Sequence, residues 1–392
     1  MVDIHNYKRR LERTLQRVEE STISPENKAL IRKFYQRCTI DSMSLSKVER
    51  YLYDLKKFAL MLNKSFLDAT KDDIMEIVAK IEMSEWSVHT KHSFKVMIRK
   101  FYKIIEGSDE KGDYPERIRW LHSNIKNNQL KSPAEMLTEI EIKRMIECSE
   151  KTRDRALIAC LYESGCRISE IGLIKIKDVV FDQYGAVMNV TGKTGPRRVR
   201  LVTSAFYLKE WINKHETNGN PDSYVWISTV TRKLIGYARF SDIIQRMAKR
   251  AGIEKRVYAH LFRHSRATFL ANRLTEAQMK SYLGWTQSSK MAAIYVHLSG
   301  RDTDAAILGI NGIELEEKKE ENSQLIPKEC LRCKKRYSST TRFCDQCGLI
   351  LDNEEAQKII KVELERREMD EFMNKIVENK DVLKQLMEKM KK

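Results

Sequence analysis

One strand-turn-strand pattern interrupts a chain whose apolar residues otherwise follow the spacing of α-helices. In "AVMNVTGKTGPRRVRLV" (186–202), apolar and polar residues alternate on both sides of a Gly-Lys-Thr-Gly-Pro turn, which is the signal of a β-hairpin. Before and after this segment, apolar residues recur every three or four positions, as they do along one face of a helix. The sequence therefore predicts a mainly α-helical protein with a small antiparallel β-sheet.

Capping residues mark helix starts in the first third of the chain. Ser24 precedes a Pro-Glu pair, and Thr70 is followed three positions later by Asp73, the arrangement of a capping box. Residues 108–137 are richer in polar and turn-forming residues, so we expect one short helix and a linker there. After the hairpin, helices are expected to resume over residues 204–309.

A helix predicted over residues 89–105 interleaves basic and aromatic side chains. A solvated basic face opposite a packed aromatic face describes most helices of this kind. The basic balance of the whole chain favours a second interpretation, in which the basic face contacts phosphates. The residues predicted to bind DNA on this helix are Lys91, Lys95, Arg99 and Lys103.

The formal net charge of +17 favours a polyanionic partner. Lysines and arginines that neutralise phosphates release condensed counterions, and this release drives association. A membrane surface is a competing polyanion, but no apolar run approaches the roughly 18 residues of a spanning helix. The N-terminus also lacks the apolar core of a signal peptide. We therefore predict a cytoplasmic protein that does not act at a membrane.

The eight cysteines form two unlike sets. Four are scattered singly and are expected to be reduced. The others form two CxxC pairs separated by ten residues in "CLRCKKRYSSTTRFCDQCG", a spacing that suits tetrahedral zinc in a segment too short to fold otherwise. We predict a structural zinc ribbon, with no coordination position left open for catalysis; whether its basic residues contact DNA or another protomer stays open. The predicted ligands are Cys330, Cys333, Cys344 and Cys347.

A cluster of cationic side chains is predicted on one helix face at residues 257–270. Side chains three and four positions apart are neighbours on a helix, so His260, Arg263 and His264 lie together. Clustered cations repel one another unless an anion lies between them. However, buried histidines often bond to backbone carbonyls and arginines usually pair with carboxylates. The cluster alone does not decide between an anion site and a structural role.

Three segments together resemble the signatures of the tyrosine recombinase, or lambda integrase, family. "ESGCRISEIGLIKIKDV" (163–179) resembles the first signature, "HLFRHSRATFL" the second, and "LGWTQSSKMAAIYVHLSG" (283–300) the third. Their order and separation also fit. The resemblance covers residues 138 to 300 and is closest to archaeal-type integrases. The helical N-terminal part is similar to the family's core DNA-binding domain only in general character.

The resemblance implies an enzyme that cuts and rejoins DNA strands without a catalytic cofactor. A tyrosine hydroxyl attacks a phosphodiester, releases a 5′-hydroxyl and forms a 3′-phosphotyrosyl bond, which the 5′-hydroxyl of another strand then attacks. Charge grows on the non-bridging phosphate oxygens in the transition state, and forked guanidinium donors are suited to stabilise it. By the motif match, these donors are Arg167 and Arg263.

Further roles follow from the same resemblance. Tyr295 matches the nucleophile; because a free phenol has a pKa near 10, cations and a proton acceptor must assist it. His260 matches a general acid/base, since imidazole titrates near neutral pH. Lys193 matches the lysine that protonates the leaving 5′-oxygen, with Arg197 and Arg198 as nearby rivals.

Glu170 has an alternative role, and Trp285 departs from the usual family pattern. Glu170 matches the acidic residue that orients the catalytic groups, although it is also compatible with a surface ion pair. Trp285 stands where many members carry a second histidine; its indole N–H can donate to a phosphate oxygen but cannot shuttle a proton. The gap from Trp285 to Tyr295 is one residue longer than in many bacterial members, so Tyr282 stays a rival nucleophile.

The expected organisation has five parts. They are a helical core DNA-binding domain (1–130), a tyrosine recombinase catalytic domain (131–312), an acidic linker (313–329), the zinc ribbon (330–351) and a helical tail (352–392). The tail carries an apolar stripe that either packs on its own chain or docks on a neighbouring protomer. The stripe comprises Met369, Phe372, Met373, Ile376, Leu383, Leu386, Met387 and Met390.

We predict a nucleoid-associated site-specific recombinase that assembles as a tetramer on specific double-stranded attachment sites. Its two DNA-binding domains are expected to clamp the duplex from opposite sides. Integration or excision of a mobile element is the favoured task. The alternatives are Xer-like resolution of chromosome or plasmid multimers, a type IB topoisomerase, and a regulator that kept the fold but lost catalysis. The complete set of matched catalytic residues argues against the regulator.

Overall fold

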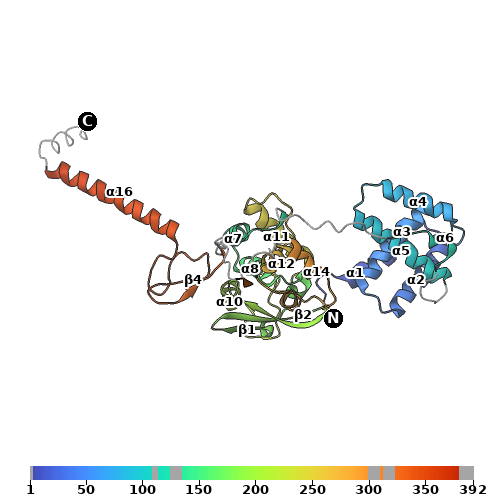
Figure 1. Ribbon diagram of the computed structural model, residues 1–392, viewed down its shortest axis with the longest axis horizontal. Helices are drawn as coiled ribbons and strands as arrows, with labels where there is room; N and C mark the ends of the chain where they lie inside the picture. The colour runs from blue at the N-terminus through green and yellow to red at the C-terminus, as the bar shows by residue number, and fades with distance from the viewer. Residues whose placement is uncertain (1–2, 108–113, 124–134, 299–309, 312–322, 379–392) are drawn as a thin grey trace. The chain divides into compact units, whose positions relative to one another are not determined.

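The computed structural model divides the chain into two compact units, Met1–Lys131 and Ser132–Lys392 (Figure 1). The residues that the structure describes are 3–107, 114–123, 135–298, 310–311 and 323–378. Residues 313–322 of the predicted acidic linker (313–329) lie outside them, as does the part of the predicted tail beyond residue 378. None of the described helices is long and apolar enough to cross a membrane.

The described part of the first unit is helical. The two predicted starts are present: the Ser24 hydroxyl accepts a hydrogen bond from the N–H of Asn27, and Thr70 and Asp73 form a complete capping box. Its helices are α1 (Tyr7–Glu19), α2 (Pro25–Ile40), α3 (Leu45–Leu62), α4 (Lys71–Met83), α5 (Val88–Glu106) and α6 (Glu116–Arg119).

The core of the first unit is built around the aromatic face of α5. Phe94, Phe101 and Tyr102 are completely buried, and the ring of Phe101 lies with its centroid 4.7 Å from that of Phe66. Burial of each such side chain contributes about 1.5–3 kcal/mol. The aromatic half of the predicted basic and aromatic helix is therefore its packing face.

The second unit contains the predicted hairpin as part of a three-stranded antiparallel sheet. β2 (Gly185–Gly192) and β3 (Gly195–Leu201) are paired so that Gly192 lies opposite Gly195, with a two-residue turn between them. A third strand, β1 (Val179–Asp182), pairs with β2 and was not predicted, because its Val-Val-Phe-Asp sequence does not alternate apolar and polar residues. The order in the sheet is β1-β2-β3.

The helices of the second unit lie above this sheet in the view of Figure 1. α8 is the central one: nearly all of its residues are buried, and α7, α10 and α12 pack on it. The helices are α7 (Glu139–Glu147), α8 (Thr152–Ser164), α9 (Ile168–Gly172), the short 3₁₀ helix η2 (Ile176–Asp178), α10 (Ala205–Asn213), α11 (Tyr237–Arg250), α12 (Ala259–Ala271), α13 (Glu276–Leu283) and α14 (Met291–Leu298).

The prediction of helices from residue 204 onward is wrong over residues 214–236. This stretch contains isolated bridges, such as Ile227 with Leu234, but no helix. Its Asn-Gly-Asn-Pro sequence at residues 218–221 supplies the residues that favour turns and end helices. The chain therefore crosses from α10 to α11 as a loop.

The described C-terminal part begins with a short hairpin, β4 (Lys328–Glu329) and β5 (Arg336–Tyr337), and continues into α16 (Asn353–Glu378). Two members of the predicted apolar stripe on α16, Met369 and Met373, are 61% and 51% exposed. These two side chains therefore do not pack against the described part of their own chain. The side chains of the other predicted members lie outside the described residues: Phe372, Ile376, Leu383, Leu386, Met387 and Met390.

The capping box at the start of α4 is expected to stabilise the first unit measurably. Thr70→Ala removes the hydroxyl that accepts the Asp73 N–H, so the free energy of unfolding should fall by about 1 kcal/mol. Urea denaturation followed by circular dichroism measures this change. Thr39→Ala, at an exposed position of α2, is the control and should stay within about 0.5 kcal/mol. Equal effects from both variants would contradict the assignment.

Candidate active site

One cavity in the second unit, of about 870 Å³, gathers most of the residues predicted to act in catalysis. It lies between the start of α9, the turn joining β2 and β3, helix α12, and the segment from α13 into α14. Glu170 is not part of the lining; its side chain is buried beside it. The predicted residues that line the cavity are Arg167, Lys193, His260, Arg263, Trp285 and Tyr295.

Glu170 joins two arginines at the floor of this site. Arg167 precedes α9, and its backbone N–H and its guanidinium both donate to the Glu170 carboxylate, at 2.8 and 2.9 Å. Arg197 donates to the same carboxylate at 2.8 Å. Burial alone favours the neutral acid, but the hydrogen bonds from Arg197 and Arg167 hold the pKa of Glu170 below its usual value. Glu170 is therefore a buried anion rather than part of a surface pair.

The alternation of β3 directs Arg197 toward this site. Side chains on a strand point to opposite faces in turn, so Arg197 shares a face with Val199 and Leu201, both of which are buried. Gly192 on the neighbouring strand makes room for the ion pair, because a Cβ there would lie 2.2 Å from Oε1 of Glu170. The hairpin thus contributes a buried arginine as well as its turn.

The C-terminal end of α13 accepts hydrogen bonds from three arginines. Backbone carbonyls at a helix C-terminus carry partial negative charge and stabilise cations without neutralising them. Gly284 there has a φ of +63°, and a Cβ would lie 2.7 Å from the Arg197 guanidinium, so glycine is required. The bonds are Arg197 Nε to Tyr282 O at 3.0 Å, Arg263 Nη2 to Leu283 O at 2.6 Å, and Arg167 Nη1 to Gly284 O at 3.4 Å.

The site is positively charged as a result. Three guanidiniums meet there, and Glu170 is the one carboxylate that the hydrogen bonds of the described residues bring to them. Burial first, and then repulsion from Arg167, lowers the pKa of Arg263 to about 10. A bound anion would remove this repulsion. Guanidinium groups bind phosphate oxygens through paired donors, so the cavity is suited to a phosphate group.

His260 is neutral at pH 7 in this environment. Burial, followed by repulsion from His264, Arg263 and Arg167, lowers its pKa to about 4. A neutral imidazole has one donor and one acceptor nitrogen. His260 can therefore hydrogen-bond to an anion in the cavity without adding a charge.

Tyr295 stands in the wall of the cavity with 2% of its surface exposed. Its ring is parallel to that of Trp285, with an interplanar angle of 5° and centroids 5.6 Å apart. The Arg263 guanidinium lies 5.4 Å from the centroid of the Trp285 ring. Burial raises the pKa of Tyr295 to about 12, so the phenol is protonated at neutral pH and needs a proton acceptor before it can act as a nucleophile.

The rival tyrosine lies away from the cavity. The Tyr282 hydroxyl donates to the backbone carbonyl of Glu163 at 3.0 Å, and burial raises its pKa. Tyr282 contributes only its carbonyl to the arginine cluster. Of the two tyrosines considered from the sequence, Tyr295 is the one whose side chain lines the cavity.

Lys193 occupies the exposed turn between β2 and β3 and has no partner among the described residues. Its two rivals are placed differently. Arg197 is held by Glu170, and Arg198 is exposed on the other face of β3 and does not line the cavity. Lys193 is thus the basic residue of the turn that is available to a ligand in the cavity.

His264 contacts the site, although no catalytic role for it was predicted from the sequence. It extends from α12, and its Nδ1 forms a hydrogen bond with the hydroxyl of Tyr295. The sequence placed it on the same helix face as His260 and Arg263, which was the available signal. The contact itself joins residues 31 positions apart, and helix periodicity cannot predict it.

The basic residues predicted to bind DNA from α5 already have partners within the first unit. The prediction that they contact DNA stays a prediction. Their partners are as follows: Lys91 bonds to the Glu82 carbonyl at 2.6 Å, Lys95 pairs with the Glu82 carboxylate at 2.7 Å, Arg99 bonds to Ser123 at 3.2 Å, and Lys103 lies 5.4 Å from the Tyr114 ring.

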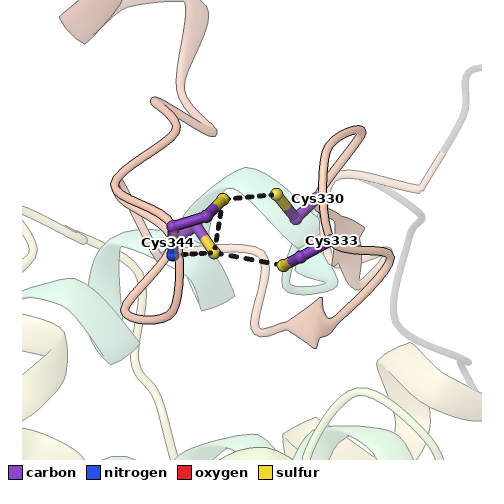
Figure 2. Close-up of side chains that lie close together, drawn as sticks. Cys330, Cys333 and Cys344 are labelled. Atoms are coloured by element: carbon purple, nitrogen blue, oxygen red, sulfur yellow. Dashed lines mark hydrogen bonds between the residues drawn. The ribbon is translucent and has the colours of Figure 1, made fainter.

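The four C-terminal cysteines converge, with their sulfur atoms all within 4.8 Å of one another (Figure 2). Both CxxC pairs fold in the same way. The N–H of the residue after each pair, Lys334 and Gly348, donates to the carbonyl of the first cysteine, at 2.8 and 2.9 Å. These two residues have φ values of +61° and +72°. The repeated turn directs four thiols to one point.

This cluster has the geometry of a metal site. Zinc held by four thiolates at about 2.3 Å separates the sulfurs by roughly 3.8 Å. The thiol sulfurs that are in hydrogen-bond contact with one another here lie 3.3 to 3.5 Å apart. The donor set and its spacing fit a four-coordinate ion, with every position filled by protein.

A cationic cavity with a tyrosine in its wall is suited to bind an anionic group. Residues 135–301 match the model of the phage integrase family. The three segments that resemble the tyrosine recombinase signatures all lie within this match, so the predicted resemblance to that family is confirmed for this part of the chain.

Relatives and solved structures agree with this family. The tyrosine recombinase XerA of Pyrococcus furiosus is 25% identical over 301 residues, which are 76% of this chain and 98% of the relative. The fold resembles that of the XerH site-specific recombinase bound to palindromic difH substrate in a post-cleavage complex (TM-score 0.55, 19% identity, 79% of this chain and 98% of the other). It also resembles a lambda integrase tetramer bound to a Holliday junction (TM-score 0.53, 14% identity, 69% and 80%).

Replacement of Glu170 should expose the repulsion among the arginines. Glu170→Gln leaves Arg167 and Arg197 without their shared anion, and removal of one partner of a buried pair costs about 3–5 kcal/mol. Because the folded pKa of Glu170 is depressed, its contribution is present above the unfolded value of about 4.3 and is lost as pH falls through the folded value.

Urea denaturation of wild-type and variant protein between pH 7 and pH 3 measures this effect. The difference in unfolding free energy should be largest at pH 7 and should shrink below about pH 4. The control, Glu210→Gln, removes solvent-accessible pairs with Lys214 and Arg155 and should change stability by less than about 1 kcal/mol. A Glu170→Gln difference that does not vary with pH would contradict the ion-pair account.

Proposed function

We propose that this protein cuts and rejoins DNA strands at specific sites through a 3′-phosphotyrosyl intermediate. The observation that carries the proposal is the meeting of Tyr295 with Arg167 and Arg263 in one cationic cavity. A phosphodiester is the anion that such a cavity fits, and a tyrosine hydroxyl in its wall is a suitable nucleophile. Double-stranded DNA is the proposed substrate.

Each residue of the cavity has a proposed role. Arg167 and Arg263 bind the non-bridging oxygens of the phosphate and stabilise the charge that develops on them. Neutral His260 and the indole N–H of Trp285 add hydrogen bonds to the same oxygens. Lys193, free at the tip of its turn, protonates the departing 5′-oxygen. Glu170 positions the arginines and does not touch the substrate.

The proposed assembly is a tetramer on two paired DNA sites. The supporting observation is the likeness in fold to the lambda integrase tetramer on a Holliday junction. The basic residues of α5 are proposed as a DNA-contacting surface of the first unit. This role requires Lys91, Lys95, Arg99 and Lys103 to exchange their present partners for phosphates. Because the substrate is genomic DNA, we place the protein at the nucleoid in the cytoplasm.

Integration or excision of a mobile element is the proposed biological task. Resolution of chromosome or plasmid multimers is the second candidate, and the similarity to XerA along nearly the whole of that relative favours it. Recombination between two sites on one plasmid distinguishes the candidates: a resolvase converts a dimer to monomers and an integrase joins two unlike sites. Relaxation of supercoils by single protomers on unrelated sequences would instead favour a topoisomerase.

We propose that the cysteine cluster holds one zinc ion. The four sulfurs and their twin turns fit a tetrahedral site. When bound, zinc supplies a cross-link between the two CxxC turns and no chemistry in the cavity. The chain supplies all four ligands, and the ribbon's fold depends on them.

Tyr295→Phe tests the nucleophile. The substrate is a nicked duplex, enriched from a random-sequence library by binding to the protein, from which a short 5′-hydroxyl strand diffuses away after cleavage. Wild-type protein should accumulate a covalent protein-DNA adduct without added magnesium. Tyr295→Phe should form none while it binds the duplex normally. Tyr282→Phe keeps the Tyr295 hydroxyl in the cavity and should form the adduct. An adduct from Tyr295→Phe and none from Tyr282→Phe would make Tyr282 the nucleophile.

Metal analysis tests the zinc site. Purified wild-type protein should contain about one zinc per chain, and a Cys330→Ser, Cys347→Ser variant should contain none, because two of four ligands are lost. Cys148→Ser changes a cysteine outside the cluster and should retain the metal. Wild-type protein that is metal-free and keeps a folded ribbon would exclude the site.

A further inference from the structure

We propose that His264 is the proton acceptor for the hydroxyl of Tyr295, an inference that rests on the proposed function. Its Nδ1 is hydrogen-bonded to that hydroxyl. The two residues come from α12 and α14, which pack against each other. A nucleophile and a base within hydrogen-bond reach form the arrangement that activates a hydroxyl.

The imidazole contacts the hydroxyl without being part of the cavity lining. Tyr295 lines the cavity, whereas His264 is not among its lining residues. When the hydroxyl donates to Nδ1, its proton points toward His264. The lone pairs of the oxygen are then left for a phosphorus atom in the cavity. The contact is therefore suited to attack rather than to blocking of the nucleophile.

His260 is less suited to this role. It lines the cavity, and the cations around it oppose the uptake of a proton. Its ring meets that of His264 edge to face, with centroids 4.7 Å apart. A neutral His260 beside His264 adds no positive charge to oppose a proton arriving on His264. The two imidazoles of the helix are thus assigned different tasks, one toward the phosphate and one toward the nucleophile.

The step balances without any further reactant. A bond forms between the Tyr295 oxygen and phosphorus while the bond from phosphorus to the 5′-oxygen breaks. The hydroxyl proton moves to Nδ1 of His264, and the departing 5′-oxygen takes a proton from Lys193. In rejoining, the incoming 5′-hydroxyl returns a proton to Lys193, and the imidazolium of His264 reprotonates the departing phenolate.

Two substitutions separate proton transfer from positioning. His264→Asn keeps an acceptor oxygen near the place of Nδ1 but has no base at neutral pH, and His264→Ala removes the acceptor as well. Both should slow single-turnover adduct formation by about 10²–10⁴-fold, the usual contribution of a general base. His122→Asn, an exposed histidine of the first unit, should leave the rate unchanged. Circular dichroism and duplex binding establish that each variant is folded.

The leaving group identifies which proton transfer is lost. The nicked duplex is prepared with sulfur in place of the scissile 5′-oxygen, because a thiolate departs without protonation. This substrate should restore the rate of Lys193→Ala and should not restore His264→Asn. Rescue of His264→Asn by sulfur, or a rate for it within a few-fold of wild type on the oxygen substrate, would overturn the proposal and leave the recombinase function standing. Wild-type protein that forms no adduct with either substrate would overturn both.

Discussion

Three guanidiniums are held together at the C-terminal end of α13 by neutral backbone carbonyls. Arg197, Arg263 and Arg167 donate to the carbonyls of consecutive residues there. Carboxylates in these places would cancel the charge, whereas carbonyls orient each guanidinium and leave it positive. Glu170 is the one carboxylate bonded to these three guanidiniums among the described residues, so the cavity keeps a net positive charge and is suited to a phosphate.

Other parts of the second unit position these arginines and place the remaining site residues beside them. Glu170 bonds to both Arg167 and Arg197 and holds them together. Close packing at Gly192 holds the hairpin against Glu170 of α9, and close packing at Gly284 holds α13 against Arg197 of the hairpin. The small sheet thereby positions a buried arginine on β3 and a free lysine in its turn. α12 contributes Arg263 to the same point, and α14 brings the tyrosine to it.

Much of this could be predicted from the sequence, for identifiable reasons. The hairpin has an alternating pattern and a marked turn that carries Lys193, the capping boxes have fixed spacings, and the other predicted site residues of the cavity lie in signature segments. The hydrogen bonds from the arginines to the carbonyls of α13 could not be predicted, because any residue type supplies a backbone carbonyl. The contact between His264 and Tyr295 depends on how α12 and α14 pack. The loop at 214–236 shows its turn residues, but they were outweighed by the helical spacing around them.

The most direct test of the central claim is to locate the covalent bond within the protein. Trypsin cleaves after Lys280, Lys290 and Arg301, so Tyr282 and Tyr295 fall in separate peptides, 281–290 and 291–301. Adduct trapped on the nicked duplex, digested with nuclease and trypsin, should show a phosphotyrosyl nucleotide on peptide 291–301 by mass spectrometry. A nucleotide on peptide 281–290, or on any peptide from the first unit, would contradict an account in which the arginines at the end of α13 present the phosphate to Tyr295.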